Sequence, residues 1–373
     1  MGINRHREVL ADLLRLAGVE LEGTRPWDIH VYDERVYERL ESQPELGLGE
    51  SYMAGWWEAE RVDEFVFKIL RADLQDMVKR NLGIALRLAG FRLMNMQKRS
   101  RAFIVGERHY DLGNELFTKM LDRRMNYSCA YWKDAKTLDE AQENKLWLVC
   151  EKLYLKPGMK VLDIGCGWGA FGKYAAEKYG VEVVGVTVST EQVSLGRELC
   201  RDLPVKFLLQ DYREVEGQFD RVVSIGMIEH VGYRNYRDYF KVAGRSLKDD
   251  GLFLLHTIGS PRSVKSTDAW THKYIFPNGM QPSVAQLGKA IEGIFVVEDW
   301  HNFGADYDKT LMAWYENFVG GWSGLREKYG ETFFRMWKFF LLSSAGAFRA
   351  RSNQLWQIVL SKKGVIGGYK SIR

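Results

Sequence analysis

A glycine-rich run at residues 161–169, VLDIGCGWG, has the residue types of a ligand-binding turn. A short apolar strand ends in alternating glycines and leads into a helical stretch at Ala170–Lys178, an arrangement that brings backbone N–H groups close to a ligand. The GxGxG spacing fits an S-adenosylmethionine loop better than the GxGxxG of a dinucleotide fold. Glycine-rich turns also occur without a ligand, so the motif alone leaves both readings open. Its candidate cofactor residues are Asp163, Gly165, Gly167 and Gly169.

Polar side chains also follow the later predicted strands, at the edge where open α/β sheets bind ligands. Thr187 and Gln192 follow the second strand, where many nucleoside-binding folds carry an acid. The third strand precedes Asp211, Tyr212 and Arg213, which suit an adenine because Tyr212 offers an aromatic face. The fourth and fifth strands end at Glu229-His230 and at His256-Thr257-Ile258. Each of these residues, taken alone, more often has a structural role. Five adjacent strand ends that all carry polar residues nevertheless favour a ligand-binding site.

The elements that must position these residues alternate between strand and helix from about residue 150. The apolar patterns predict strands at Val161–Ile164, Val181–Val188, Val205–Leu209, Phe219–Ile225, Leu252–His256, Phe295–Trp300 and Gln357–Lys362. They predict helices at Glu191–Cys200 and Tyr236–Leu247, and Ser283 with Gln286 predicts a capping box at the start of another. This alternation indicates an α/β fold with a mostly parallel sheet. The loop Gly259–Pro282 is long enough to be functional or mobile.

Length and composition are those of a globular protein with two domains. The chain has 373 residues, 46% hydrophobic and 27% charged, with a net charge of only +4. Met1–Arg15 is too charged for a signal peptide, and no apolar stretch reaches the roughly 18 residues needed to span a bilayer. The four cysteines form no metal-like pairs and no disulfide framework. We therefore expect a cytoplasmic protein with reduced thiols, no metal and no nucleic-acid partner.

Basic residues gather between Lys68 and Arg108, where they outnumber acids. The segment Phe65–Met96 reads either as a basic amphipathic helix for a membrane surface or as a core-packing helix with a charged face. The sequence patterns predict a mainly helical N-terminal domain at 1–88, a linker at 89–105 and a second domain at 106–373.

With these residues laid out, the chain resembles the cyclopropane-fatty-acyl-phospholipid synthases and their mycolic acid relatives. The resemblance rests on segments that occur in family order over about residues 106–362: HYDLGNELF, YSCAYW, LDIGCGWG, GVTVS-x-EQ, QDYR, GMIEHVG, LLHTIG, KYIFPNG, EDWHNFGADYD and AGAFRAR. It implies a Rossmann-like class I S-adenosylmethionine-dependent methyltransferase domain. The N-terminal domain would engage membrane lipid, the enzyme would associate peripherally with the inner face of the cell membrane, and it would act as a homodimer.

The reaction implied by the resemblance adds the sulfonium methyl group to a cis double bond in a phospholipid acyl chain. A carbocation-like centre then loses a proton and closes a cyclopropane ring, with bound hydrogencarbonate as the base. The residues that match the hydrogencarbonate site are Cys129, Glu229, His256, Tyr307 and, through its backbone, Ile258. We expect Glu229 to accept the proton of the ion itself and to orient it. The competing interpretation is that Glu229 and His256 only tie strand ends together.

The resemblance also assigns cofactor contacts, to Tyr127 and Ser128 and to the strand-end residues already named, Gly165, Gly167, Thr187, Gln192, Tyr212 and Arg213. Arg213 stands where the mycolic acid relatives carry an acid. Ser344 stands where family members often have a cysteine, which argues against an obligatory thiol nucleophile at that position.

Three alternatives remain open at the level of sequence. The same carbocation would give a methyl or methylene branch if the base sat elsewhere. A lipid-binding or lipid-transfer protein would keep the fold but lose the base-site residues, and these are intact. A methyltransferase for small soluble molecules is disfavoured by the basic segment.

Overall fold

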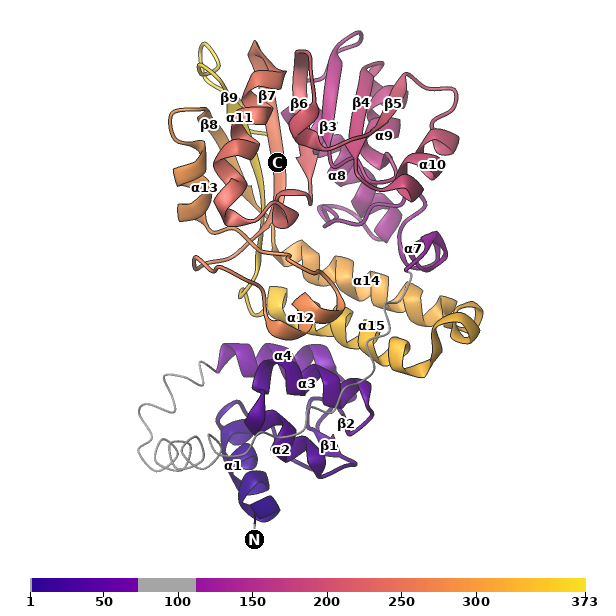
Figure 1. Ribbon diagram of the computed structural model, residues 1–373, viewed down its shortest axis with the longest axis vertical. Coiled ribbons are helices and arrows are strands. Elements are labelled where there is room, and N and C mark those ends of the chain that lie inside the picture. Colours follow the sequence, from indigo (N-terminus) through magenta and orange to yellow (C-terminus); the bar gives the residue numbers. More distant parts are fainter. Residues whose placement is uncertain (1, 73–111) are drawn as a thin grey trace. The chain divides into compact units, whose positions relative to one another are not determined.

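The computed structural model describes residues 2–72 and 112–373, which divide into two compact units (Figure 1). Unit 1 contains residues 1–116, 268–277 and 311–352, and unit 2 contains 117–267, 278–310 and 353–373. The sequence predicted one uninterrupted catalytic domain over 106–373, whereas two later segments group with the N-terminal residues. The predicted linker 89–105 and most of Phe65–Met96 lie outside the described residues.

Unit 1 is mainly helical, as expected for the N-terminal part. Its elements are α1 (Gly2–Leu16), β1 (His30–Val31), α2 (Arg35–Ser42), α3 (Pro44–Met53), β2 (Trp57–Glu58), α4 (Val62–Arg71), α12 (Ala269–Tyr274), most of α14 (Ala305–Gly321) and α15 (Arg326–Arg349), with a break at Gly330. Ion pairs explain why α15 belongs here: Arg349 bonds to Asp63 at 2.7 Å, and Arg335 bonds to Glu58 at 2.9 Å. A Cβ at Gly346 would lie 2.4 Å from the Asp63 carbonyl oxygen, so only glycine permits this approach to α4.

Unit 2 is built on a seven-stranded sheet in the order β5-β4-β3-β6-β7-β9-β8. β3, β4, β5, β6 and β7 run parallel, and β9 is antiparallel to both of its neighbours. The predicted strands are confirmed within a few residues: β3 (Lys160–Ile164), β4 (Glu182–Thr187), β5 (Val205–Leu209), β6 (Phe219–Ile225), β7 (Leu247–Gly259), β8 (Val296–Asn302) and β9 (Gln354–Ser361). β7 is longer than expected at both ends, because Leu247 pairs with Phe219 of β6 and Gly259 pairs with Gln354 of β9.

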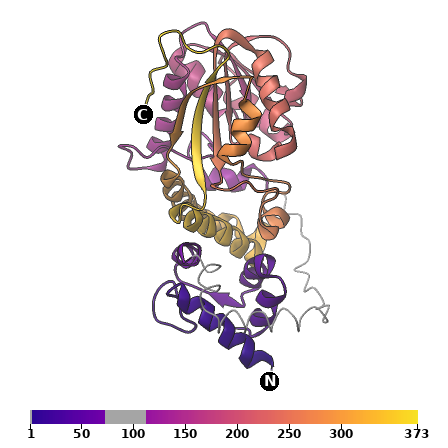
Figure 2. The same ribbon diagram turned by 90° about the vertical axis from the view of Figure 1, so that its left-hand side faces the viewer.

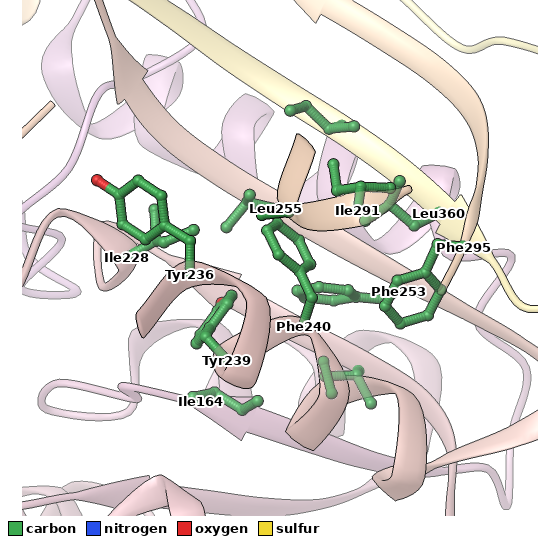
Figure 3. Close-up of a cluster of buried hydrophobic side chains, with 14 of the residues drawn as sticks. Ile164, Ile228, Tyr236, Tyr239, Phe240, Phe253, Leu255, Ile291, Phe295 and Leu360 are labelled. Atoms are coloured by element: carbon green, nitrogen blue, oxygen red, sulfur yellow. The ribbon is translucent and has the colours of Figure 1, made fainter. Parts of the chain in front are cut away.

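Helices cover both faces of this sheet, as Figure 2 shows from the side. Side chains of α8 (Leu138–Lys152) and α9 (Ala170–Tyr179) pack with Val161, Val183 and Leu254 on one face. Side chains of α11 (Tyr236–Ser246) and α13 (Val284–Ile291) pack with Leu162 and Phe253 on the other (Figure 3). Alternate strand residues therefore enter opposite cores, which fixes the register that sets the strand ends.

The remaining helices of unit 2 connect these layers. α7 (Asn114–Met120) begins in unit 1, and α10 (Thr190–Leu199) follows β4, where Ser189 caps it. The predicted capping box of Ser283 and Gln286 is confirmed at the start of α13. The long loop expected at 259–282 contains α12, which begins after the N-cap Asp268. Within the described ranges, no helix is long and apolar enough to cross a membrane.

Candidate active site

The glycine-rich turn after β3 has the geometry that the sequence predicted. Gly165, Gly167 and Gly169 have φ values of +82°, +55° and +87°, which favour glycine. The N–H groups of Gly165 and Cys166 donate to the Val186 carbonyl oxygen, at 2.9 and 3.1 Å, and hold the turn against β4. A Cβ at Gly167 would meet no atom within 4 Å, whereas one at Gly169 would lie 2.4 Å from the Phe207 ring. Gly167 thus leaves room for a ligand, and Gly169 serves packing.

A cavity of about 330 Å³ opens at this turn. Eight of the predicted cofactor residues line it: Tyr127, Ser128, Asp163, Gly165, Gly167, Thr187, Gln192 and Tyr212. Gly169, Asp211 and Arg213 are not among its lining residues. Arg213 instead donates two hydrogen bonds to the carboxylate of Asp211, at 2.9 and 2.7 Å, and this pairing lowers the pKa of Asp211. This ion pair joins the residues on either side of Tyr212. The ring centroid of Tyr212 lies 5.6 Å from that of Tyr239.

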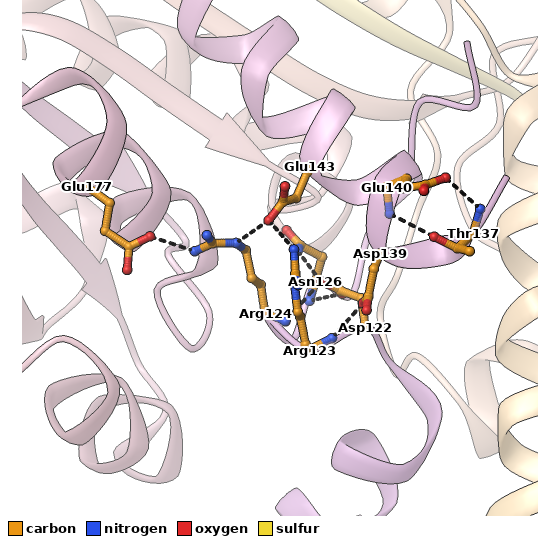
Figure 4. Close-up of polar contacts among 9 residues, drawn as sticks. All are labelled: Asp122, Arg123, Arg124, Asn126, Thr137, Asp139, Glu140, Glu143 and Glu177. Atoms are coloured by element: carbon orange, nitrogen blue, oxygen red, sulfur yellow. Dashed lines mark hydrogen bonds and ion pairs between the residues drawn. The ribbon is translucent and has the colours of Figure 1, made fainter. Parts of the chain in front are cut away.

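Two further lining residues, Asn126 and Lys145, escaped the sequence analysis. Lys145 lies on α8 and is 1% exposed, with its ammonium donating to Asn126 Oδ1 at 2.7 Å and to Ser128 Oγ at 3.2 Å. Asn126 is held in turn by the Asp122 carboxylate, which accepts from its backbone N–H at 2.8 Å and from its amide at 2.9 Å (Figure 4). A lysine inside a helical pattern reads as a solvated charge, so only the fold reveals that it is buried.

The loop before α8, which carries Asn126 and Ser128, is held in place by ion pairs. Arg123 and Arg124 both contact the Glu143 carboxylate, at 2.6 and 3.3 Å, and Arg124 also contacts Glu177 at 3.0 Å (Figure 4). The start of α8 has a capping box between Thr137 and Glu140. These contacts fix α8 and the preceding loop, and so place Lys145 and Ser128 at the cavity.

Burial shifts the protonation of the charged groups at the cavity. The pKa of Asp163 rises to about 7 because its carboxylate is desolvated, although the Lys145 charge opposes the rise. Desolvation lowers the pKa of Lys145 to about 8, and the charge of Asp122 opposes that change. An ammonium and a carboxylate buried here match the charged ends of an amino-acid moiety such as that of S-adenosylmethionine.

Glu229 lies just beyond β6, in the short 3-10 helix Ile228–His230, and is 8% exposed. Its Oε1 accepts the backbone N–H of Ile258 at 2.7 Å, which ties it to the end of β7. Its Oε2 is buried and has no hydrogen-bond partner among the described residues. Desolvation raises the pKa of Glu229 to about 7, so both protonation states are accessible near neutral pH. The backbone N–H of Ile258 is thus already used by Glu229, whereas its predicted contact with hydrogencarbonate stays a prediction.

His256 lies on β7, two residues before Ile258, and is 1% exposed. Its Nδ1 lies 3.3 Å from the side-chain amide nitrogen of Gln357. Its Nε2 is buried without a hydrogen-bond partner in the described part of the chain. Burial and the nearby charges of Lys145 and Lys152 hold the pKa of His256 well below its usual range, so the ring is neutral.

Tyr307 on α14 and Cys129 complete the predicted set, and both are buried. Desolvation holds the pKa of Tyr307 well above its usual range, and the neighbouring acidic groups of Cys129, Tyr127 and Glu229 raise it further. Burial also raises the pKa of the Cys129 thiol, which donates to the Ala130 carbonyl oxygen at 3.2 Å. Cys129 is therefore a neutral thiol and a poor nucleophile.

These residues have the chemistry to hold a small protonated oxyanion. Glu229 Oε2 and His256 Nε2 are buried polar atoms that lack partners among the described residues, which is costly unless a water or a ligand satisfies them. One can accept a proton and the other can donate one, as hydrogencarbonate requires. Ser344, in contrast, lies on α15 in unit 1, where it is half-buried.

Comparisons with known proteins identify the family of this chain. Residues 97–358 match the family described as "Mycolic acid cyclopropane synthetase". The chain is 54% identical over 362 residues to cyclopropane-fatty-acyl-phospholipid synthase of Escherichia coli K12, covering 97% of this chain and 94% of that one.

Solved structures support the same fold. The cyclopropane synthase MmaA2 of Mycobacterium tuberculosis superposes with a TM-score of 0.64 at 31% identity, over 68% of this chain and 96% of that one. Mycolic acid cyclopropane synthase CmaA1, in complex with SAH and CTAB, gives 0.63 at 33% identity over the same shares. The predicted Rossmann-like class I methyltransferase fold is confirmed.

Proposed function

Since the chain belongs to the mycolic acid cyclopropane synthetase family and is an S-adenosylmethionine-dependent methyltransferase, we propose that it cyclopropanates unsaturated acyl chains of membrane phospholipids. The observation that carries this proposal is the pairing of two features in unit 2. The cavity at the glycine turn suits the nucleoside co-substrate. Two buried polar atoms that have no hydrogen-bond partner among the described residues lie nearby in the sheet: Glu229 Oε2 just beyond β6, and His256 Nε2 within the last four residues of the neighbouring strand β7.

The cavity residues would bind and orient S-adenosylmethionine, which supplies an electrophilic methyl group on a sulfonium. Gly165 and Gly167 allow close backbone approach, Gln192 and Thr187 offer hydrogen bonds to the ribose, and Tyr212 offers a face to the adenine. Lys145 and Asp163 would meet the carboxylate and ammonium groups of the methionine part. Because an alkene is a weak nucleophile, this fixed orientation is the main help that the protein gives to methyl transfer.

The positive centre formed on the lipid must be kept from water. Aromatic faces near the site, such as those of Tyr127, Phe117 and Trp168, form a contiguous cluster with ring centroids 5.0 Å apart. Such faces stabilise a cation by about 0.5–2 kcal/mol each. Neutral Cys129 and the high pKa of Tyr307 leave no competing thiolate or phenolate nearby to trap it.

We propose that Glu229, His256, Tyr307 and Cys129 would hold hydrogencarbonate, with Ile258 orienting Glu229. When bound, the ion supplies a base for one proton of the transferred methyl group. The two buried atoms without partners support this assignment, since one accepts and the other donates. Methyl transfer followed by loss of one proton adds CH2 in total, and the ring closes between the former methyl carbon and the second alkene carbon.

The setting of the reaction is proposed as well. The basic segment between Lys68 and Arg108 would place the enzyme on anionic phospholipid at the inner face of the cell membrane, and two copies would form the working dimer. Substrate for the reaction would be an acyl chain that already carries a cis double bond.

The test incubates the protein with methyl-labelled S-adenosylmethionine and vesicles of unsaturated phospholipid, and then identifies the fatty acid. Label in a fatty acid with high-field cyclopropyl proton signals is the expected result. A labelled methyl or methylene branch would show that the product is a branched fatty acid and not a cyclopropane fatty acid. Absence of label from lipid, with transfer to a soluble acceptor, would overturn the lipid substrate itself.

A further inference from the structure

Gln357 occupies a position in the sheet from which it touches the His256 ring. It lies on β9, directly opposite His256 on β7 and directly opposite His301 on β8. Direct cross-strand partners project to the same face of a sheet, so the three side chains form one row. Gln357 is fully buried, and its amide nitrogen lies 3.3 Å from Nδ1 of His256.

The other end of this row is held by buried charges. His301 Nδ1 lies 3.0 Å from the Lys152 ammonium, which also contacts Asp299 at 3.5 Å. Asp299 receives two hydrogen bonds from Arg373, at 2.7 and 2.6 Å. Burial lowers the pKa of Lys152 to about 7. Desolvation holds the pKa of His256 well below its usual range, and the positive charges of Lys145 and Lys152 lower it further. His256 is therefore a neutral ring, and a neutral imidazole carries its single proton on one nitrogen or the other.

We infer that Gln357 is a positioning residue that donates an amide N–H to Nδ1 of His256 and thereby keeps the ring proton on Nε2. An N–H at Nε2 is a hydrogen-bond donor at the one ring nitrogen that has no partner among the described residues. The opposite tautomer would present a lone pair there, which repels an anion. This inference rests on the proposed anion site for its purpose, but the tautomer itself is a property of the protein alone.

The choice of tautomer follows from the chemistry of the row. A glutamine amide can donate or accept, so the amide alone does not select a tautomer. The requirement comes from the site: Glu229 Oε2 already offers an acceptor, and an oxyanion needs a donor beside it. Nε2–H supplies that donor only if Nδ1 accepts, and the nitrogen of Gln357 is the group that faces Nδ1.

The direct test is nitrogen NMR of the full-length protein labelled with 15N at histidine, recorded without added hydrogencarbonate. The His256 signals are those that disappear in His256→Gln. We expect a protonated Nε2 and a bare, hydrogen-bonded Nδ1 in the unmodified protein. In Gln357→Met, which keeps the side-chain length but removes the donor, the Nδ1 signal shifts and the Nδ1–H form gains population.

The matched control is Gln354→Met, the same change three residues earlier on β9. Gln354 bonds to Asn302 and to the Trp356 indole, and it pairs with Gly259 instead of a histidine. His256 signals should be unchanged in this variant. Two results would overturn the inference: an Nδ1–H tautomer in the unmodified protein, or His256 signals that Gln357→Met leaves untouched while thermal unfolding shows that the variant is folded.

A second readout connects the tautomer to the proposed function. Methyl transfer is measured in carbon-dioxide-depleted buffer as hydrogencarbonate is added back. We expect Gln357→Met to raise the concentration for half-maximal activity about tenfold or more, because a hydrogen bond to a charged ligand is lost. Binding of S-adenosylhomocysteine should stay within about twofold. If activity does not depend on hydrogencarbonate in any variant, the anion in the proposed function fails, while the NMR result still decides the tautomer.

Discussion

At the scale of residues, the site is governed by burial of groups that are usually charged. Glu229, His256 and Tyr307 were predicted from strand ends and from resemblance, and the structure buries all three. Sequence showed which residue types follow each strand, but it did not show that Glu229 Oε1 is used by the Ile258 N–H. Lys145 was not predicted, because its burial depends on packing between α8 and the sheet.

Replacing Glu229 by Gln should separate binding from chemistry. Gln retains the bond from Ile258 but cannot accept or release a proton, so turnover should fall by about 10²–10⁴-fold. Calorimetric titration with S-adenosylhomocysteine should show nearly unchanged affinity, because Glu229 does not line the cavity. Near-normal turnover in the lipid assay would remove Glu229 from the reaction.

The same substitution should change how stability depends on pH. Because burial raises the pKa of Glu229 from 4.5 to about 7, its protonated form is favoured by folding. Its contribution to stability is complete below pH 4.5 and is lost as pH rises through 7. As pH rises from 5 to 8, the free energy of unfolding of Glu229→Gln should therefore increase by roughly 1–3 kcal/mol relative to that of the unmodified protein.

Urea unfolding at both pH values measures this difference. The control is Glu214→Gln, a change at a carboxylate that is exposed to solvent. Equal stability differences for Glu229→Gln at pH 5 and pH 8 would show that the carboxyl group is not held in a desolvated state.

At the scale of elements, the parallel part of the sheet was predictable because its strands are short apolar runs separated by turn signals. β5 and β6 begin and end at the predicted residues. The end of β7 was not predictable, because Thr257, Ile258 and Gly259 are strand residues only through their pairing with β9. α12 was missed inside the loop at 259–282, although Asp268 caps it by accepting the Thr271 N–H at 2.9 Å.

Two glycines of the turn after β3 should respond differently to alanine. Gly169→Ala places a Cβ against Phe207 at φ +87° and should destabilise the protein by roughly 2–4 kcal/mol, from strain and overpacking together. Gly167→Ala meets no atom and should cost only about 1–2 kcal/mol of backbone strain. Because Gly167 lines the cavity, its variant should lose affinity for S-adenosylhomocysteine.

Thermal unfolding combined with calorimetry distinguishes the two variants. Each serves as the control for the other, since both carry the same added methyl group on the same turn. The assignment of Gly167 to the ligand and Gly169 to packing would be wrong if Gly167→Ala bound normally and Gly169→Ala unfolded at the temperature of the unmodified protein.

At the scale of the whole molecule, the division into units was only partly predictable. The N-terminal residues are mainly helical, as composition indicated, but 268–277 and 311–352 group with them. A sequence pattern cannot show this grouping, because it arises from contacts such as Arg349 with Asp63 that join distant parts of the chain. The proposed membrane segment lies mostly outside the described residues.

Charge in that segment should control binding to membranes. We expect binding to anionic vesicles to weaken when Lys79, Arg80, Arg87 and Arg92 are replaced by Gln. The loss of binding free energy, measured by sedimentation at low salt, should be about 1 kcal/mol per removed charge. S-adenosylhomocysteine affinity should be retained. Binding of the unmodified protein should also collapse as salt is added. Unchanged sedimentation of the variant would place the membrane contact elsewhere.

The proposed function requires one active site to transfer a methyl group to an alkene and to remove one hydrogen of that methyl group to close a ring. Deuterium NMR of the fatty acid formed from S-adenosylmethionine with a trideuterated methyl group tests it directly. We expect deuterium at the high-field position of a cyclopropane CD2 and none in a methyl group. A CD3 signal, or deuterium at the low-field position of a methylene branch, would contradict it.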